Sequence, residues 1–93
     1  VLLFWQAPAA PAQDWSVSVR LTRDGAEIAQ QDQAHPVAGA YPTARWSSGE
    51  VVADAYAFHL PTGVVADGVT VIPYRTQGDG SFVNLDVARF TLR

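Results

Sequence analysis

A hydrophobic period of two constrains the fold of this chain more than any other feature. Apolar and polar residues alternate through 15–22, WSVSVRLT, and such alternation is typical of a β-strand with one face in the core and one in water. Asp24 and Gly25 follow this segment. An Asp-Gly pair between two strand patterns favours a tight hairpin, because both turn positions accept positive φ. The sequence therefore predicts two antiparallel strands joined at Asp24-Gly25.

Further strand patterns occupy 1–6, 50–60, 69–75 and the last segment from Ser81. The first carries bulky apolar residues at both odd and even positions, and therefore on both faces of the strand. This favours a central strand or one covered by a neighbouring domain. In the last segment the apolar residues change parity, which predicts a bulge or a break near 87–89. The best helical candidate, 26–34, follows the hairpin and ends at His35-Pro36, so we expect almost no helix.

About six or seven short strands separated by turns predict an all-β fold, an antiparallel β-sandwich of immunoglobulin-like or jelly-roll-like type. The 93 residues suffice for one domain, 1–93, with a single core. The chain contains no methionine, so we expect it to be part of a longer protein. Its longest apolar run, 1–5, is far shorter than the roughly 20 residues of a spanning helix, so direct membrane insertion by this segment is not expected.

Composition and spacing disfavour several functions. The net charge is −3 and the six arginines are scattered, so no basic stripe favours nucleic acid as a partner. Without cysteine there is neither a disulfide framework nor a thiolate metal site. His35 and His59 do not form a recognised ligand spacing with Asp32, and no serine lies in a G-x-S-x-G elbow. We therefore expect no enzyme activity, no metal and no cofactor.

The loop before the strand pattern at 50–60 holds the best binding candidates, which are Tyr41, Arg45, Trp46 and Glu50. Aromatic rings can stack on the apolar faces of sugars, while arginine and carboxylate groups hydrogen-bond hydroxyls. Alternatively, the tryptophan covers the open end of the sandwich. A glycan site requires that Tyr41 and Trp46 both be partly exposed on one surface.

Asp54 is the unusual residue of the 50–60 pattern, because its parity places it on the same side as Val52 and Tyr56. A buried carboxylate needs hydrogen-bond donors. We expect Asp54 to anchor the preceding loop, either by accepting hydrogen bonds from backbone amides of 40–46 or by pairing with Arg45.

Four segments in order carry a resemblance to a known family: LLFWQA, DWSVSVRLTRDGAEIAQQDQ, PVAGAYPTARWSSGEVVAD and the strand end Leu60-Pro61. Together they resemble the extracytoplasmic β-sandwich domain of bacterial multi-spanning membrane proteins similar to dolichyl-phosphate-mannose-dependent glycosyltransferases. The resemblance covers roughly 1–61. Downstream, Asp67-Gly68-Val69 and Tyr74-Arg75-Thr76 stand where that family has a P-G-x-Y strand and a tyrosine-aspartate turn.

The resemblance implies a location on the extracytoplasmic side of a bacterial membrane, with transferase chemistry confined to the membrane part of the parent protein. We therefore expect a non-catalytic accessory or docking domain whose partner is that membrane part. The alternative is a carbohydrate-binding module that uses the Tyr41/Trp46 loop to bind a glycan.

Overall fold

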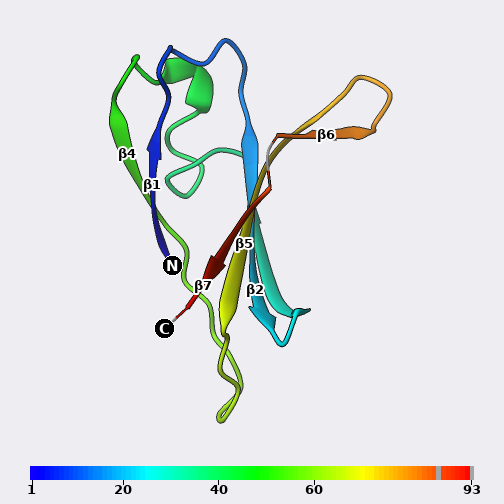
Figure 1. Cartoon of the computed structure of the whole chain (residues 1–93). Coiled ribbons are helices and arrows are strands. Elements are labelled where there is room, and N and C mark those ends of the chain that lie inside the picture. Colours follow the sequence, from blue (N-terminus) through cyan, green and yellow to red (C-terminus); the bar gives the residue numbers. More distant parts are fainter. Residues whose placement is uncertain (86, 93) are drawn as a thin grey trace.

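The computed structural model describes residues 1–85 and 87–92. Their elements are β1 (Leu2–Gln6), β2 (Ser16–Arg23), β3 (Ala26–Gln33), β4 (Val51–Ala55), β5 (Gly68–Thr76), β6 (Phe82–Asn84), β7 (Ala88–Thr91) and one 3₁₀ turn, η1 (Thr43–Arg45) (Figure 1). The predicted all-β class is confirmed. Within this part of the chain, no helix is long and apolar enough to cross a membrane.

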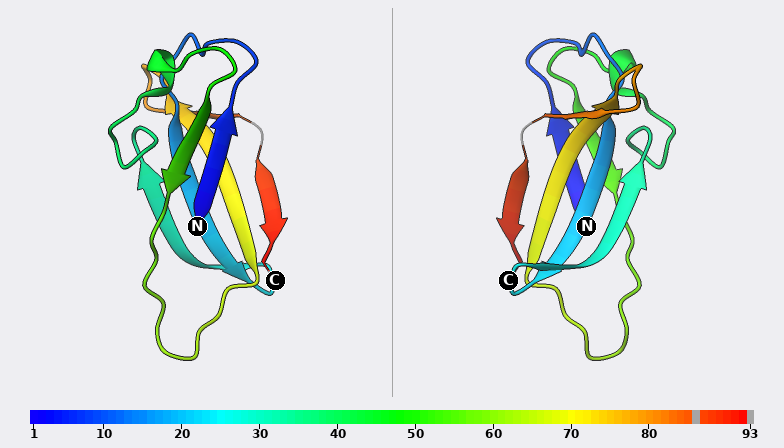
Figure 2. Two further views of the ribbon diagram at one scale, coloured as in Figure 1. Left: turned by 90° about the vertical axis from the view of Figure 1, so that its left-hand side faces the viewer. Right: turned by 90° about the vertical axis from the view of Figure 1, so that its right-hand side faces the viewer.

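The strands form two antiparallel sheets that face each other (Figure 2). The smaller sheet contains β1 and β4. The larger has the order β3-β2-β5-β6, and β7 also pairs with β5. The strands β6 and β7 share one edge of β5, at Tyr74–Thr76 and Gly68–Val71 respectively. The parity change predicted near 87–89 thus corresponds to a break between two strands, although residue 86 lies outside the described residues.

The Asp24-Gly25 hairpin is confirmed. Asp24 has φ 51° and Gly25 has φ 82°, and two positive φ values are the signature of a type I′ turn. The turn joins β2 to β3, whose register begins at Arg23 and Ala26 and shifts at a bulge between Leu21 and Thr22. The segment 26–34, considered above as a helix, therefore forms a strand.

The core lies between the sheets and follows the predicted parity. It contains Val17, Val19 and Leu21 of β2, Val69 and Val71 of β5, and Tyr56. On the opposite side Val52 and Asp54 of β4 are also buried. The strand pattern at 50–60 is only partly realised, because β4 ends at Ala55, but Phe58 and Leu60 still pack against the core.

Strand β1 pairs with β4 only, from Leu2↔Ala55 to Gln6↔Val51, within the described residues. The expectation of a central strand is therefore wrong. Leu3 and Trp5 pack against the core, whereas Leu2 and Phe4 are 58% and 67% exposed on the other face. Bulky residues on both faces are typical of a central strand, but residues 1–85 and 87–92 cover only one face of β1. Cover by a neighbouring domain stays a prediction.

Candidate functional site

Asp54 lies on β4 of the smaller sheet, opposite Leu3, and is completely buried. Its carboxylate accepts three hydrogen bonds: from the Val37 backbone amide at 2.7 Å, from the Tyr56 hydroxyl at 2.7 Å and from Trp5 Nε1 at 3.1 Å. Burial and the hydrogen bond to Asp54 both raise the pKa of Tyr56 above its ordinary value. The carboxylate therefore joins β1, β4 and the preceding loop.

Asp54 holds the preceding loop, but at a different residue from those expected. The backbone amide that donates to Asp54 belongs to Val37, outside 40–46, and Arg45 is not a partner of Asp54. Val37 and Ala38 have φ values of 58° and 52°. This left-handed region is costly for a β-branched residue, by roughly 1–3 kcal/mol. The short hydrogen bond to a buried carboxylate stabilises this unfavourable backbone conformation.

Trp46 is the buried centre of an aromatic cluster and is only 7% exposed. Its ring centroid lies 6.4 Å from that of Trp5 and 6.2 Å from that of Tyr41, with tilted planes. Its indole Nε1 donates to the Tyr41 carbonyl oxygen at 3.2 Å. The cluster covers one end of the space between the sheets, which agrees with the structural interpretation of this tryptophan.

Tyr41 and Glu50 meet beside this cluster. The Tyr41 hydroxyl donates to Glu50, with distances of 2.9 and 3.0 Å to the two carboxylate oxygens, and the Ser47 amide donates to the same carboxylate at 2.9 Å. The hydrogen bond to Glu50 raises the pKa of Tyr41, and the carboxylate charge adds to this effect. Arg45 is exposed.

The structure thus brings Tyr41, Trp46 and Glu50 together but does not meet the condition for a glycan platform. The Trp46 face is covered by its neighbours, and the Glu50 carboxylate is already used by Tyr41 and Ser47. Of Tyr41 and Trp46, only Tyr41 is partly exposed. The loop therefore lacks the second exposed ring on which the carbohydrate prediction depended.

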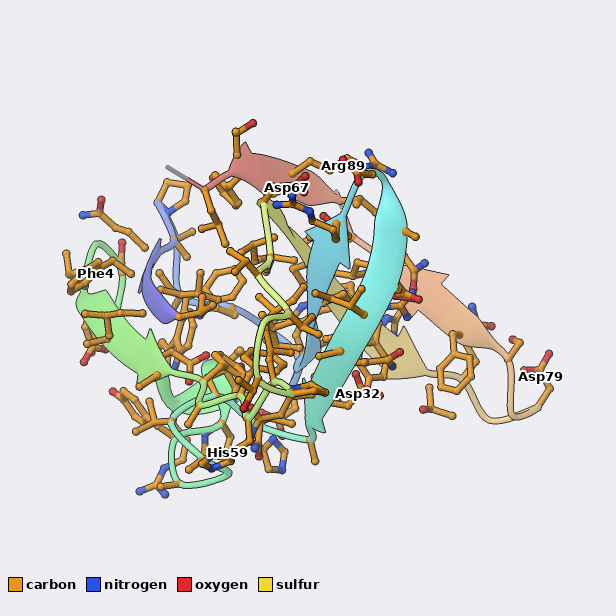
Figure 3. The ribbon with its side chains drawn as sticks, turned by 90° about the horizontal axis from the view of Figure 1, so that it is seen from below. Phe4, Asp32, His59, Asp67, Asp79 and Arg89 are labelled. Atoms are coloured by element: carbon orange, nitrogen blue, oxygen red, sulfur yellow. The ribbon has the colours of Figure 1, made fainter. Side chains whose placement is uncertain are left out.

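The remaining candidate groups are dispersed. His59 is exposed, and Nδ1 of the half-buried His35 has no hydrogen-bond partner in the part of the chain that the structure describes. In residues 1–85 and 87–92, no group of three histidine or acidic side chains could hold a metal ion. At Gly78-Asp79-Gly80 the chain makes a turn, in which Asp79 accepts hydrogen bonds from Ser81 that lower its pKa. Figure 3 shows Asp79 at the tip of this turn, far from Phe4.

All three tryptophans line a single apolar pocket of about 370 Å³ at the end of the molecule that holds η1. Prolines 11, 36 and 73 also contribute to its wall. The Arg75 guanidinium lies over the Trp15 ring, 5.6 Å from its centroid. The polar atom of Thr43 in this wall is already paired, since its hydroxyl donates to Gln13 and accepts from the Trp15 amide. The pocket thus offers apolar contact and little polar recognition.

A second apolar groove, of about 360 Å³, lies between β1 and β7, and we call it the β1/β7 groove. Among the described residues its lining side chains are apolar: Val1, Leu2, Leu3 and Phe4 on one side, Val69 of β5 beneath, and Phe90 and Leu92 on the other. The α-ammonium group of Val1 donates to the Tyr56 carbonyl oxygen. Phe90 and Leu92 are 54% and 42% exposed. The sequence predicted neither concavity, because each combines residues from distant segments. The only available signal for the groove was the run of bulky residues at 1–6.

Comparisons with protein-family models, with curated proteins and with solved structures found no match to this chain.

Proposed function

We propose that this chain is a non-catalytic docking module, built as an antiparallel β-sandwich, within a larger protein. The observation that carries the proposal is the β1/β7 groove, where exposed apolar side chains of two strands surround a concave surface. Contiguous exposed apolar surface of this kind is typical of interaction sites. The groove would bury apolar side chains of a partner protein.

The resemblance over 1–61 supports a more specific setting for this function. In that setting the module lies on the extracytoplasmic side of a bacterial membrane, and its partner is the membrane part of a glycosyltransferase-like parent protein. An immunoglobulin-like or jelly-roll-like arrangement of the strands belongs to the same proposal. The carbohydrate-binding alternative is weaker, because Trp46 is buried and Glu50 is occupied.

Peptide binding tests the docking function. Short capped peptides with apolar side chains would be titrated into the whole chain by calorimetry, some of them strand-forming, others helix-forming or proline-rich. We expect saturable binding for at least one class. We also expect Phe90→Ser to weaken that binding about tenfold, because it removes an apolar wall of the groove.

The matched control is Phe82→Ser. Phe82 is 66% exposed, at least as exposed as Phe90, but it lies on β6 outside the groove. This variant should bind peptide as the parent does. Absence of binding for every peptide class, or an equal loss in both variants, would contradict a docking role for the groove.

A further inference from the structure

The free edge of β1 has hydrogen-bonding groups that no strand of the described residues uses. Val1 both donates to and accepts from the Tyr56 backbone, at 2.7 Å in each direction. Hydrogen-bonded pairs alternate along an antiparallel ladder, so the Leu3 and Trp5 backbones also face β4. The N–H and C=O groups of Leu2, Phe4 and Gln6 consequently point away from β4. They form a row of donors and acceptors along one side of the groove.

This edge also lacks the devices that usually protect edge strands. Natural edge strands carry charges, prolines or bulges that prevent further pairing. The β1 sequence, LLFWQ, has no charge and no proline, and its register with β4 runs without a shift. Two of its three exposed side chains, those of Leu2 and Phe4, are apolar. The edge is therefore suited to accept another strand.

The floor beneath such a strand is already present. In Figure 2 the larger sheet extends past β1 through β5 and β7, so that a strand placed beside β1 would lie over these two. Its inward side chains would contact Val69 and Phe90. Its outward side chains would lie beside Leu2 and Phe4, where cross-strand apolar pairs are favourable.

We propose that the β1/β7 groove binds one extended, uncharged segment of a partner protein, which adds as a strand to the free edge of β1. This inference rests on the proposed docking function and specifies its partner as a single strand. Such β-augmentation takes affinity from main-chain hydrogen bonds and specificity from alternate side chains. The apolar side chains that line the groove among the described residues disfavour charged residues at the inward positions of the bound segment.

A second copy of this chain fits the site less well than a lone strand. If β1 of a second copy paired here, that copy would bring its own larger sheet to the space beneath. That space is already filled by β5 and β7 of the first copy (Figure 2). The bound segment therefore needs to be a single strand that does not carry a second sheet packed against its inward face.

The test compares Phe4→Pro with Phe4→Ala in the whole chain. Both variants remove the ring, but only proline removes the outward N–H, and proline is tolerated at edge positions whose N–H faces away from the ladder. We expect strand-forming peptides to bind Phe4→Pro about tenfold more weakly than Phe4→Ala. Equal affinities for the two variants would overturn strand addition, while groove-dependent binding would still support docking.

Amide hydrogen exchange in the parent chain provides a second measurement that does not depend on the fold of a variant. Bound peptide should slow exchange at the amides of Leu2, Phe4 and Gln6, while those of Leu3 and Trp5 change little because they already pair with β4. No added protection at the first three amides, or a dimer formed through β1 in solution, would contradict the inference. If no peptide of any class binds, the docking function fails together with it.

Discussion

At the scale of single residues, Asp54 connects more of the structure than any other side chain described above. Replacing it with alanine leaves the Val37 amide, the Tyr56 hydroxyl and the Trp5 indole without their shared acceptor. We expect Asp54→Ala to lower the free energy of unfolding by roughly 1–3 kcal/mol, because buried donors lose their partner. Urea denaturation measures this change.

Asp32→Ala is the control, since Asp32 is exposed on β3 and, within residues 1–85 and 87–92, its carboxylate accepts hydrogen bonds only from the Gln30 side chain. Its effect should stay within about 0.5 kcal/mol. If Asp54→Ala were as stable as this control, the three hydrogen bonds would contribute nothing net to the fold.

Tyr41 provides a test of local electrostatics. Its raised pKa means that the folded chain holds the phenolic proton more tightly than the unfolded chain does. The resulting stability is fully present below the ordinary value of 10.0 and is lost as the pH rises through the folded-state pKa. Glu50→Gln removes the acceptor charge, so the Tyr41 pKa should fall. Alkaline titration of phenolate absorbance should then show one tyrosine ionising at lower pH, whereas Glu27→Gln should leave the curve unchanged.

At the scale of elements, the turn of the β2–β3 hairpin requires a positive φ at Gly25. Gly25 has φ 82°, and a Cβ built there meets no atom within 4 Å. Gly25→Val should therefore destabilise the chain through strain, by about 1–2 kcal/mol, without any steric clash. A thermal melt compares it with Gly78→Val, at a glycine that is equally open but has no positive φ. Equal melting temperatures for the two variants would argue against the type I′ turn.

The strands themselves follow from local alternation, and so they could be predicted: the pattern at 15–22 corresponds to β2, Ser16–Arg23. The β2–β3 pairing could also be predicted from its turn residues, but the pairing of β1 with β4 could not, because nothing in either segment encodes that Leu3 lies opposite Asp54. The same limit applies to the site. Parity placed Asp54 inside, but its donors at Val37 and Trp5 are 17 and 49 residues away in the sequence.

The loop 36–50 shows a different limit of prediction. Its composition allowed Trp46 to be either a ligand platform or a cover for the core, since both uses need an aromatic ring on a loop. The contact between Trp46 and Trp5 decides between these two uses, and Trp5 lies on β1, near the start of the sequence. Exposure therefore depends on tertiary packing that no local pattern records.

At the scale of the whole molecule, Trp46 closes one end of the two-layer structure. Trp46→Ala should open a cavity between Trp5 and Tyr41 and cost about 3–5 kcal/mol. That is a large share of the roughly 5–15 kcal/mol that stabilises a typical domain. Guanidinium denaturation should show a much lower midpoint than for Phe82→Ala, whose ring is mostly exposed. A midpoint near that of the parent would mean that the end of the sandwich repacks without this ring.

The gathering of all three tryptophans around one pocket also gives the molecule a localised optical reporter. Indole emission responds to the polarity around each ring, so the fluorescence of the whole chain reports the state of the end that holds η1. The β1/β7 groove contains no tryptophan side chain in its lining. A change in emission maximum during unfolding therefore marks the separation of the sheets at the tryptophan end, while fraying of β7 would pass without an optical signal.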